Sequence, residues 1–376
     1  MPMIGPDDDL GLAFDMHGCP NRCRHCWLDH RVVTPPRTRM TEDDVRWAVA
    51  QFRASRRAGE DRAPSRRLRV QTWIREPDYA DDYRELHALA MELSDVPPER
   101  DRMELLSVWR LARDPEYARW LYDLGMREAQ LSFFGLEKAT DWATRRRGAF
   151  RDLLTATERL LAAGIRPRWQ LFFTKLLIPD LPGLIALAEE LRLKERCEAL
   201  GGPFTFWMHT PSPDGAGLGL EHLRPTDRDL ERVPRAFLEH CEAHTKRAIG
   251  TTERVLMRTL RNDPAPAVTS LSEATSGHPL WLYVASNFDA YPSFTGVWPA
   301  HRLGNLKTDG VAGVLDTWEH DRTPGLQAMF HTPTAELARA YGRPYGRRLY
   351  DTGDLPWRWV ALRARESEQC RNEPLR

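Results

Sequence analysis

The chain has 376 residues, which suffices for one large α/β domain with an extension or for two domains. Its 54 lysine and arginine residues balance 54 aspartate and glutamate residues, so no net charge draws it to nucleic acid or to an anionic membrane. The acidic N-terminus does not read as a signal peptide, and no run reaches the ~18 apolar residues that span a bilayer, so we expect a cytoplasmic protein.

Apolar, strand-like runs alternate with amphipathic stretches whose ends carry helix-capping residues. The expected strands, in chain order, cover residues 10–14, 68–74, 103–108, 129–134, 168–173 and 204–209. Repeated strand–helix units predict parallel strands, here an α/β fold consisting of a partial (β/α)6 parallel barrel with a smaller C-terminal α+β extension. We place the barrel at residues 1–225, a helix and linker at 226–279, and the extension at 280–376.

Three cysteines, Cys19, Cys23 and Cys26, stand close together in "CPNRCRHC", directly after the first expected strand. Loops at the carboxyl ends of parallel strands are where such folds place their ligands. A long chain with six cysteines, expected in reducing cytosol, is not a disulfide scaffold. The clustered cysteines are therefore expected to bind metal.

Two kinds of metal site fit three cysteines. Zinc takes four ligands, and the fourth could come from His17, His25 or His30. Zinc ligands usually come as two separated pairs, however, and no distant pair completes this set. A [4Fe–4S] cluster fits the count better, because three thiolates bind three irons and leave the fourth open to a substrate or cofactor.

The spacing of three and then two residues between the cysteines resembles the signature of the radical S-adenosylmethionine (radical SAM) superfamily. The resemblance covers residues 10–215 and implies that His25 fills the aromatic place before the third cysteine. It implies that the open iron binds S-adenosylmethionine, and that an electron from the cluster cleaves this cofactor to methionine and a 5′-deoxyadenosyl radical.

Further segments resemble the cofactor-binding loops of this family. In "TWIREPDY", Glu76 and Pro77 match the end of a Gly-Gly-Glu-Pro motif, which implies that Glu76 binds the amino group of the cofactor. Ile74 and Arg75 replace the glycines, and a guanidinium at Arg75 could hold a carboxylate. The alternative is a surface glutamate before a proline turn.

The stretch "QLSFFGLEKATDWATRRRGAF" resembles the next cofactor-binding region. It implies that Ser132 contacts the ribose or methionine end, and that one of Arg145, Arg146 or Arg147 binds the methionine carboxylate. The alternative is a solvated basic turn. The Pro/Gly loop 208–217 could bring backbone groups to the adenine, or could be a simple connection.

Residues 281–326 resemble the SPASM/twitch extension that holds auxiliary clusters in many family members, but without its cysteines. Only Cys370 lies beyond residue 241, so we expect no second cluster. The resemblance then favours redox-neutral radical chemistry, such as rearrangement, elimination, epimerisation or decarboxylation.

We expect a small polar metabolite as substrate, possibly within natural-product biosynthesis, and an electron donor such as flavodoxin or ferredoxin, with no nucleic-acid or membrane partner. Cys197, Cys241 or Cys370 could return a hydrogen atom to the product, although a lone cysteine is more often an inert buried thiol. The alternatives are a peptide-modifying radical SAM enzyme and a noncatalytic zinc-binding protein.

Overall fold

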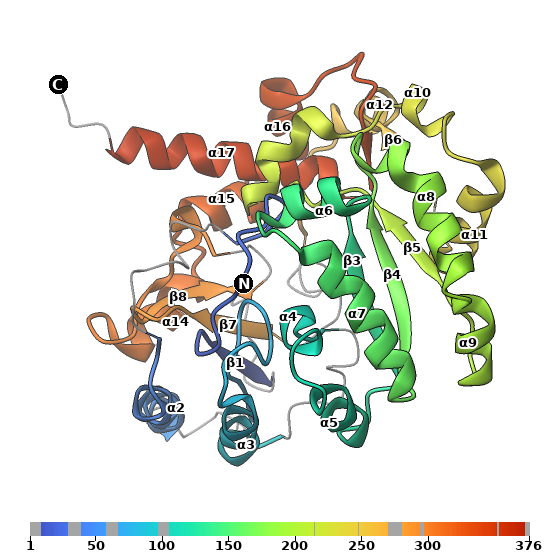
Figure 1. Ribbon diagram of the computed structural model, residues 1–376. Coiled ribbons are helices and arrows are strands. Elements are labelled where there is room, and N and C mark those ends of the chain that lie inside the picture. Colours follow the sequence, from blue (N-terminus) through green and yellow to red (C-terminus); the bar gives the residue numbers. More distant parts are fainter. Residues whose placement is uncertain are drawn as a thin grey trace.

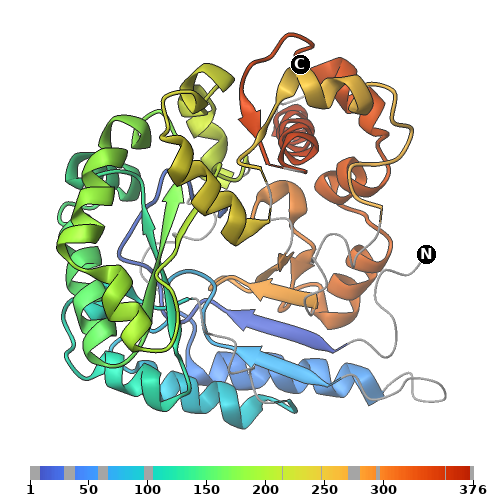
Figure 2. The same ribbon diagram turned by 90° about the vertical axis from the view of Figure 1, so that its right-hand side faces the viewer.

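The described part of the fold contains two larger β-sheets, covered on their outer faces by helices, and one two-stranded pair (Figures 1 and 2). The computed structural model describes residues 9–28, 39–57, 67–96, 105–213, 215–246, 248–269, 280–293, 297–351 and 353–372. Among these residues, no helix combines the length and apolar character needed to cross a membrane.

The first sheet joins the N-terminal strands to the C-terminal third of the chain. Its strands lie in the order β2-β1-β7-β8-β9, with bounds Leu68–Gln71, Leu10–Phe14, Leu280–Val284, Asp289–Pro292 and Gly304–Asn305. Both β2 and β7 pair with β1 in parallel, whereas β8 and β9 add antiparallel strands. Strand β7 therefore extends the sheet of β1 on the side opposite β2.

The second sheet is wholly parallel and lies in the order β3-β4-β5, with bounds Glu128–Phe133, Arg166–Phe172 and Phe206–His209. A further two-stranded pair joins β6 (Thr251–Thr252) to β10 (Leu349–Tyr350). No hydrogen-bonded ladder connects β2 to β3 in the described ranges, so the strands form an open barrel.

Helices pack on the outer faces of the two sheets because those faces carry the apolar side chains. The first sheet packs against α2 (Glu42–Arg57), α3 (Tyr83–Leu93) and α14 (Gly310–Glu319). The second packs against α7 (Ala149–Ala162), α8 (Leu177–Glu190) and α11 (Arg235–Thr245). Each interface forms a continuous buried core.

The remaining helices connect strands or build the C-terminal part. Their bounds are α4 Val108–Leu111, α5 Tyr117–Asp123, α6 Glu137–Thr144, α9 Leu193–Ala199, α10 Asp227–Leu230, α12 Glu253–Leu260, α15 Pro324–Phe330, α16 Thr334–Tyr341 and α17 Asp354–Asn372, with 3₁₀ helices η2 Gly215–Leu223 and η4 Pro299–His301.

The parallel α/β architecture is confirmed, but the third expected strand, 103–108, is wrong. Residues 103 and 104 lie outside the described ranges, and the described remainder, 105–107, pairs with no strand. Ser107 instead caps α4, because its hydroxyl accepts a hydrogen bond from Arg110 N (3.1 Å). The segment therefore leads into a capped helix and does not form the strand that its apolar residues suggested.

Residues 280–319 contain three strands followed by a helix. Strand β7 leads through a turn to β8, the short β9 contains the "GN" of the "LGN" sequence, and α14 carries the buried Trp318. The domain boundaries at residues 225 and 280 stay predictions. The pairing of β7 with β1 was not foreseen, because nothing in either sequence specifies a partner so distant along the chain.

Side chains alternate along β3 between the helical core and the barrel interior. Ala129, Leu131 and Phe133 are buried in the core, whereas Gln130 and Ser132 point the other way. The interior face of this sheet is therefore polar, unlike the packed apolar interior of an ordinary closed barrel. A polar interior is suited to binding a ligand.

Candidate functional site

The cysteine loop follows β1 and lies against the C-terminal end of α6. The Arg22 N–H donates to Thr144 O (3.2 Å), and the Arg24 N–H donates to Ala143 O (2.7 Å). A third backbone bond, from Cys26 N to Cys23 O (3.2 Å), closes a turn within the loop itself. These contacts hold the loop, which begins at the carboxyl end of β1, against the end of the helix that follows β3.

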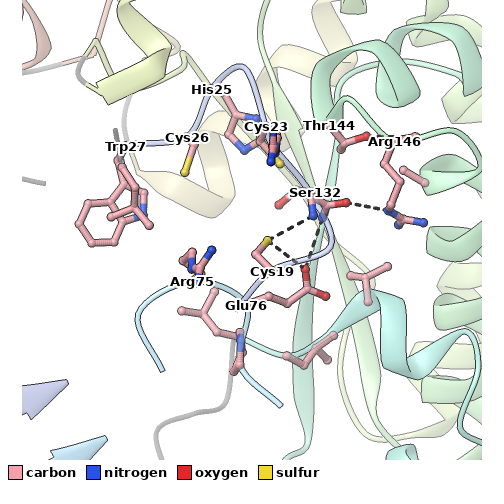
Figure 3. Close-up of a pocket in the computed structure, with 18 of the residues that line it drawn as sticks. Cys19, Cys23, His25, Cys26, Trp27, Arg75, Glu76, Ser132, Thr144 and Arg146 are labelled. Atoms are coloured by element: carbon pink, nitrogen blue, oxygen red, sulfur yellow. Dashed lines mark hydrogen bonds between the residues drawn. The ribbon is translucent and has the colours of Figure 1, made fainter. Parts of the chain in front are cut away.

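All three clustered cysteines line one cavity of about 360 Å³. Figure 3 shows their side chains around the same space, with Arg75 and Glu76 across from the loop. Burial raises the pKa of the Cys19 thiol, and the charge of Glu76 raises it further. Burial, with the neighbouring Cys19 and Cys26, also raises the pKa of Cys23. Three thiolates at this place therefore require a cation to offset their charge.

The donor set can be tested against the two metals that the sequence leaves open. Within the described ranges, no three His, Cys, Asp or Glu side chains converge on a point that would hold one metal ion. His17 is engaged elsewhere, since its Nε2 meets Thr72 Oγ1 (3.3 Å) and its Nδ1 accepts from Ala80 N (3.4 Å). His30 lies outside the described residues. A cubane fits better, because its three thiolates bind three different irons.

Glu76 forms the side of the cavity that faces Cys19, with Pro77 beside it. Its Oε1 accepts from Ser107 Oγ (2.7 Å) and Trp109 N (3.3 Å). Its Oε2 lies 3.8 Å from Cys19 Sγ and accepts from Asn21 Nδ2 (3.3 Å). Burial raises the pKa of Glu76, although these hydrogen bonds act in the opposite direction. Glu76 is thus an internal carboxylate at the site, and the surface alternative is wrong.

A chain of polar contacts continues from Glu76 to the arginine triplet. Asn21 Oδ1 accepts from Arg146 Nε (2.6 Å), and Arg146 also pairs with Asp152. Arg146 lines the cavity, whereas Arg145 and Arg147 are exposed and outside its lining. This placement favours Arg146 among the three arginines for the predicted carboxylate-binding role and does not support Arg145 or Arg147.

Arg75 has a carboxylate partner, but the partner belongs to the chain. Its Nε and Nη2 meet the two oxygens of Asp15 at 3.0 and 2.8 Å, just beyond the end of β1. Burial raises the pKa of Asp15, and the Arg75 guanidinium lowers it in part. This bidentate pair ties the loop after β2 to the start of the cysteine loop, in place of the flexible glycines of the resembling motif.

His25 packs against two phenylalanine rings, with its ring centroid 4.4 Å from that of Phe134 and 4.6 Å from that of Phe172. The two phenylalanine rings are themselves stacked at 4.4 Å. The histidine thus occupies an aromatic environment, consistent with its predicted place in the cysteine motif. Phe134 also lines the cavity, so this packing connects the cysteine loop to the wall formed by β3 and β4.

Ser132 begins a hydrogen-bonded chain across the interior face of the second sheet. Ser132 Oγ and Gln130 Nε2 both donate to Gln170 Oε1 (2.5 and 2.8 Å). Gln170 Nε2 lies 2.6 Å from His209 Nε2, and His209 Nδ1 lies 2.8 Å from Thr210 O. Burial lowers the pKa of His209, which favours the neutral ring with its proton on Nδ1.

The sequence contained a signal for this polar wall that the prediction missed. Polar residues recur at every second position of β3 and β4, as in "EAQLSF" and "RPRWQLF". A period of two places them on one face, opposite the core. Gln130 and Gln170 could therefore have been assigned to the interior once the strands were accepted.

The loop after β5 packs directly on the cysteine loop. Ala216 N donates to Cys26 O (2.7 Å), and Gly215 has a φ of +51°. A Cβ at Gly215 would lie 2.3 Å from the Trp27 carbonyl carbon, so no other residue fits without displacement. The described part of this Pro/Gly loop contacts the cysteine loop, and its contact with the adenine stays a prediction.

Two of the three solitary cysteines, Cys197 and Cys241, have described side chains, and neither faces the cavity. Cys197 and Cys241 are buried in the core outside the second sheet, and burial raises the pKa of Cys197 to about 11 and that of Cys241 to about 12. The side chain of Cys370 lies outside the described part of the structure. The position of Cys197 and Cys241 does not support a hydrogen-donor role.

Several solved structures resemble this chain in backbone. One is anSMEcpe with bound AdoMet and Kp18Cys peptide, at 14% identity and a TM-score of 0.47, over 97% of this chain and 100% of that chain. Another is SuiB of Streptococcus suis bound to precursor peptide SuiA, at 15% identity and a TM-score of 0.46, over 93% of this chain and 76% of that chain.

A third is coproporphyrinogen III oxidase (HemN) from Escherichia coli, described as a radical SAM enzyme, at 12% identity and a TM-score of 0.40, over 96% of this chain and 91% of that chain. No protein-family model matches the chain, and no curated protein matches it. Since these TM-scores lie below 0.5, the function must be inferred from the site itself.

Proposed function

We propose that the chain is a radical SAM enzyme that binds one [4Fe–4S] cluster through Cys19, Cys23 and Cys26, and S-adenosylmethionine in the adjoining cavity. The observation that carries the proposal is the lining of this cavity, where the three cysteines meet Glu76, Ser132 and Arg146. A loop with three thiols, a buried carboxylate and a guanidinium suits a cluster beside a zwitterionic amino-acid cofactor.

Different side chains around the cavity would bind different parts of this cofactor. The cluster, when bound, would supply the electron that cleaves S-adenosylmethionine to a 5′-deoxyadenosyl radical. Glu76 would accept a hydrogen bond from the cofactor's ammonium, and Arg146 would attract its carboxylate. Ser132 is placed to bind a hydroxyl group, and the phenylalanines around His25 keep water from this side of the loop.

The substrate that we propose is a small polar metabolite in the barrel interior, converted without net oxidation. The polar interior face of β3, β4 and β5 supports this, because Gln130 and Ser132 line the cavity and the hydrogen-bonded Gln170 and His209 lie behind them. The extension supports redox-neutral chemistry, because Cys370 is the only cysteine beyond residue 241. A second cluster would need several thiolates there.

The proposal is tested by anaerobic assay of the iron-reconstituted protein with S-adenosylmethionine and dithionite. We expect 5′-deoxyadenosine and methionine to form with the wild-type protein and not with Cys26→Ala. Cys197→Ala is the matched control, since that thiol is buried away from the cavity, and should retain cleavage. Zinc retention with no cleavage by the wild-type protein would favour the noncatalytic alternative.

A further inference from the structure

A group of arginines lies beside the cysteine loop; Arg22, Arg145 and Arg147 are exposed, and Arg22 also lines the rim of the cavity. Arg22 and Arg24 flank Cys23 in sequence, and their backbones bond to Thr144 and Ala143 at the end of α6. Arg145 and Arg147 follow in the turn after α6. We call these four residues, together with Trp142, the basic patch.

The basic patch is contiguous and partly aromatic. The guanidinium of Arg24 lies 4.2 Å from the ring centroid of Trp142 and donates to Trp142 O (3.1 Å). Trp142 is 37% exposed, which is unusual for so large an apolar side chain. Arg145 adopts a left-handed backbone conformation at the helix end (φ 53°), and its side chain is exposed. A rigid aromatic surrounded by cations is a common feature of protein-binding surfaces.

The charge of the basic patch is not neutralised within the described part of the chain. Many arginines elsewhere form ion pairs, such as Arg46 with Glu92 and Arg196 with Glu158. No ion pair or hydrogen bond in the described ranges engages the side chain of Arg22, Arg145 or Arg147. In a chain with no net charge, this is a local positive field.

Two acids that lie close to the basic patch in the sequence, Asp141 and Asp152, are already engaged. Asp141 accepts from the backbone N–H groups of Gly148 and Phe150 (2.6 and 3.0 Å). Asp152 pairs with Arg146 and with Arg113 (2.9 Å). The exposed guanidinium groups therefore remain available to an acidic partner.

We propose that the basic patch is the docking surface for an acidic one-electron donor protein, such as a flavodoxin. The inference rests on the proposed function, because it assumes a cluster on the loop that carries Cys23. The donor loses one electron and the cluster gains one, and no atom is transferred. Redox complexes are typically small and transient, so charge complementarity between exposed groups suffices to orient the donor.

The test is calorimetric binding of an oxidised, acidic flavodoxin to the reconstituted protein and to two charge-reversal variants. Arg145→Glu/Arg147→Glu leaves two arginines beside two new glutamates, which cancels the positive charge of the basic patch without touching the cavity lining. Arg192→Glu/Lys194→Glu is the matched control, since both residues are exposed, share the same spacing, and Arg192 is likewise left-handed (φ 52°). The control pair lies at the start of α9, toward the opposite end of the strands from α6 (Figure 1).

We expect the patch variant to bind flavodoxin about tenfold more weakly at low salt, the control to bind within about twofold of wild type, and the difference to fade at high salt. Dithionite-driven cofactor cleavage should be unchanged in both variants. Equal flavodoxin affinity in the patch variant would overturn the proposal.

Two other outcomes would also overturn it. Loss of dithionite-driven cleavage in the patch variant would assign these arginines to the cofactor instead. Patch-dependent binding of a single-stranded oligouridine, without binding of flavodoxin, would indicate an RNA partner. Should wild-type protein show no cleavage with dithionite, the proposed function fails, whereas the binding measurement still decides whether the patch holds an acidic protein.

Discussion

Replacing Glu76 by glutamine tests the role of the buried carboxylate with a change of one atom. Its two oxygens accept from Ser107 Oγ, Trp109 N and Asn21 Nδ2. Because Trp109 N is an obligate donor, the amide oxygen of a glutamine must face Ser107 and Trp109. The amide NH₂ then faces Asn21 Nδ2, which is also a donor.

The structure sets the magnitude of the effect. Asn21 cannot simply turn its amide over, because its Oδ1 accepts from Arg146 Nε (2.6 Å). One charge-assisted hydrogen bond to Asn21 is therefore lost, and the negative charge that would meet the cofactor's ammonium is removed. A hydrogen bond to a charged group contributes about 1.5–3 kcal/mol, so S-adenosylmethionine should bind about ten- to a hundredfold more weakly.

Calorimetry with S-adenosylmethionine on reconstituted Glu76→Gln provides the assay, with iron content measured on the same sample. Iron should stay at the wild-type level, since the thiolates are unchanged. Glu253→Gln is the matched control, because Glu253 is also a buried carboxylate whose pKa burial raises, and it accepts from Arg343 N (3.0 Å) away from the cavity. Unchanged cofactor affinity in Glu76→Gln would refute the assignment.

Three further changes give distinct outcomes. Cys23→Ala should lose nearly all iron after reconstitution while keeping its circular dichroism, and full iron retention would contradict a three-thiolate site. Gly215→Ala should lower the free energy of unfolding by about 2 kcal/mol, because residue 215 has a positive φ and its new Cβ would clash with the cysteine loop. Gly201→Ala (φ +87°), whose Cβ meets nothing within 4 Å, should lower it less. Glu221→Gln should lower it by about 2–3 kcal/mol, which denaturant unfolding would measure. Burial opposes ionisation of Glu221, but the charges of Arg224 and Arg358 outweigh this effect and lower the pKa of Glu221. The ion pairs therefore stabilise the fold above the ordinary pKa of 4.5, and this stabilisation is lost as the pH falls below that value. Equal losses of stability in Glu221→Gln at pH 3 and at pH 7 would contradict the ion pairing.

Residue patterns within short segments of the sequence predicted most of the strands and the position of the cysteine loop. The alternating strand and helix runs gave five of the six barrel strands, and the cysteine spacing gave the loop after β1. The run at 103–108 misled because apolar residues alone cannot distinguish a strand from the approach to a short helix. Ser107, a good capping residue, was the signal that favoured α4.

The rest of the site depends on contacts between distant segments. The sequence "TRRRG" does not say which arginine turns inward, because that is decided by the left-handed helix end at Arg145, which directs Arg146 toward Asn21. Likewise, nothing in "WIREP" indicates that Arg75 pairs with Asp15, sixty residues earlier in the chain. Such pairings arise from the tertiary fold, and only the candidate residue types were predictable.

The most direct test of the three-cysteine cluster is metal analysis combined with electron paramagnetic resonance of the reconstituted, reduced protein. We predict about four irons and about four sulfides per chain, no zinc, and a signal from the reduced cluster that changes when S-adenosylmethionine is added. One zinc per chain, about eight irons, or a cluster signal indifferent to S-adenosylmethionine would contradict a single cluster with an open iron at Cys19, Cys23 and Cys26.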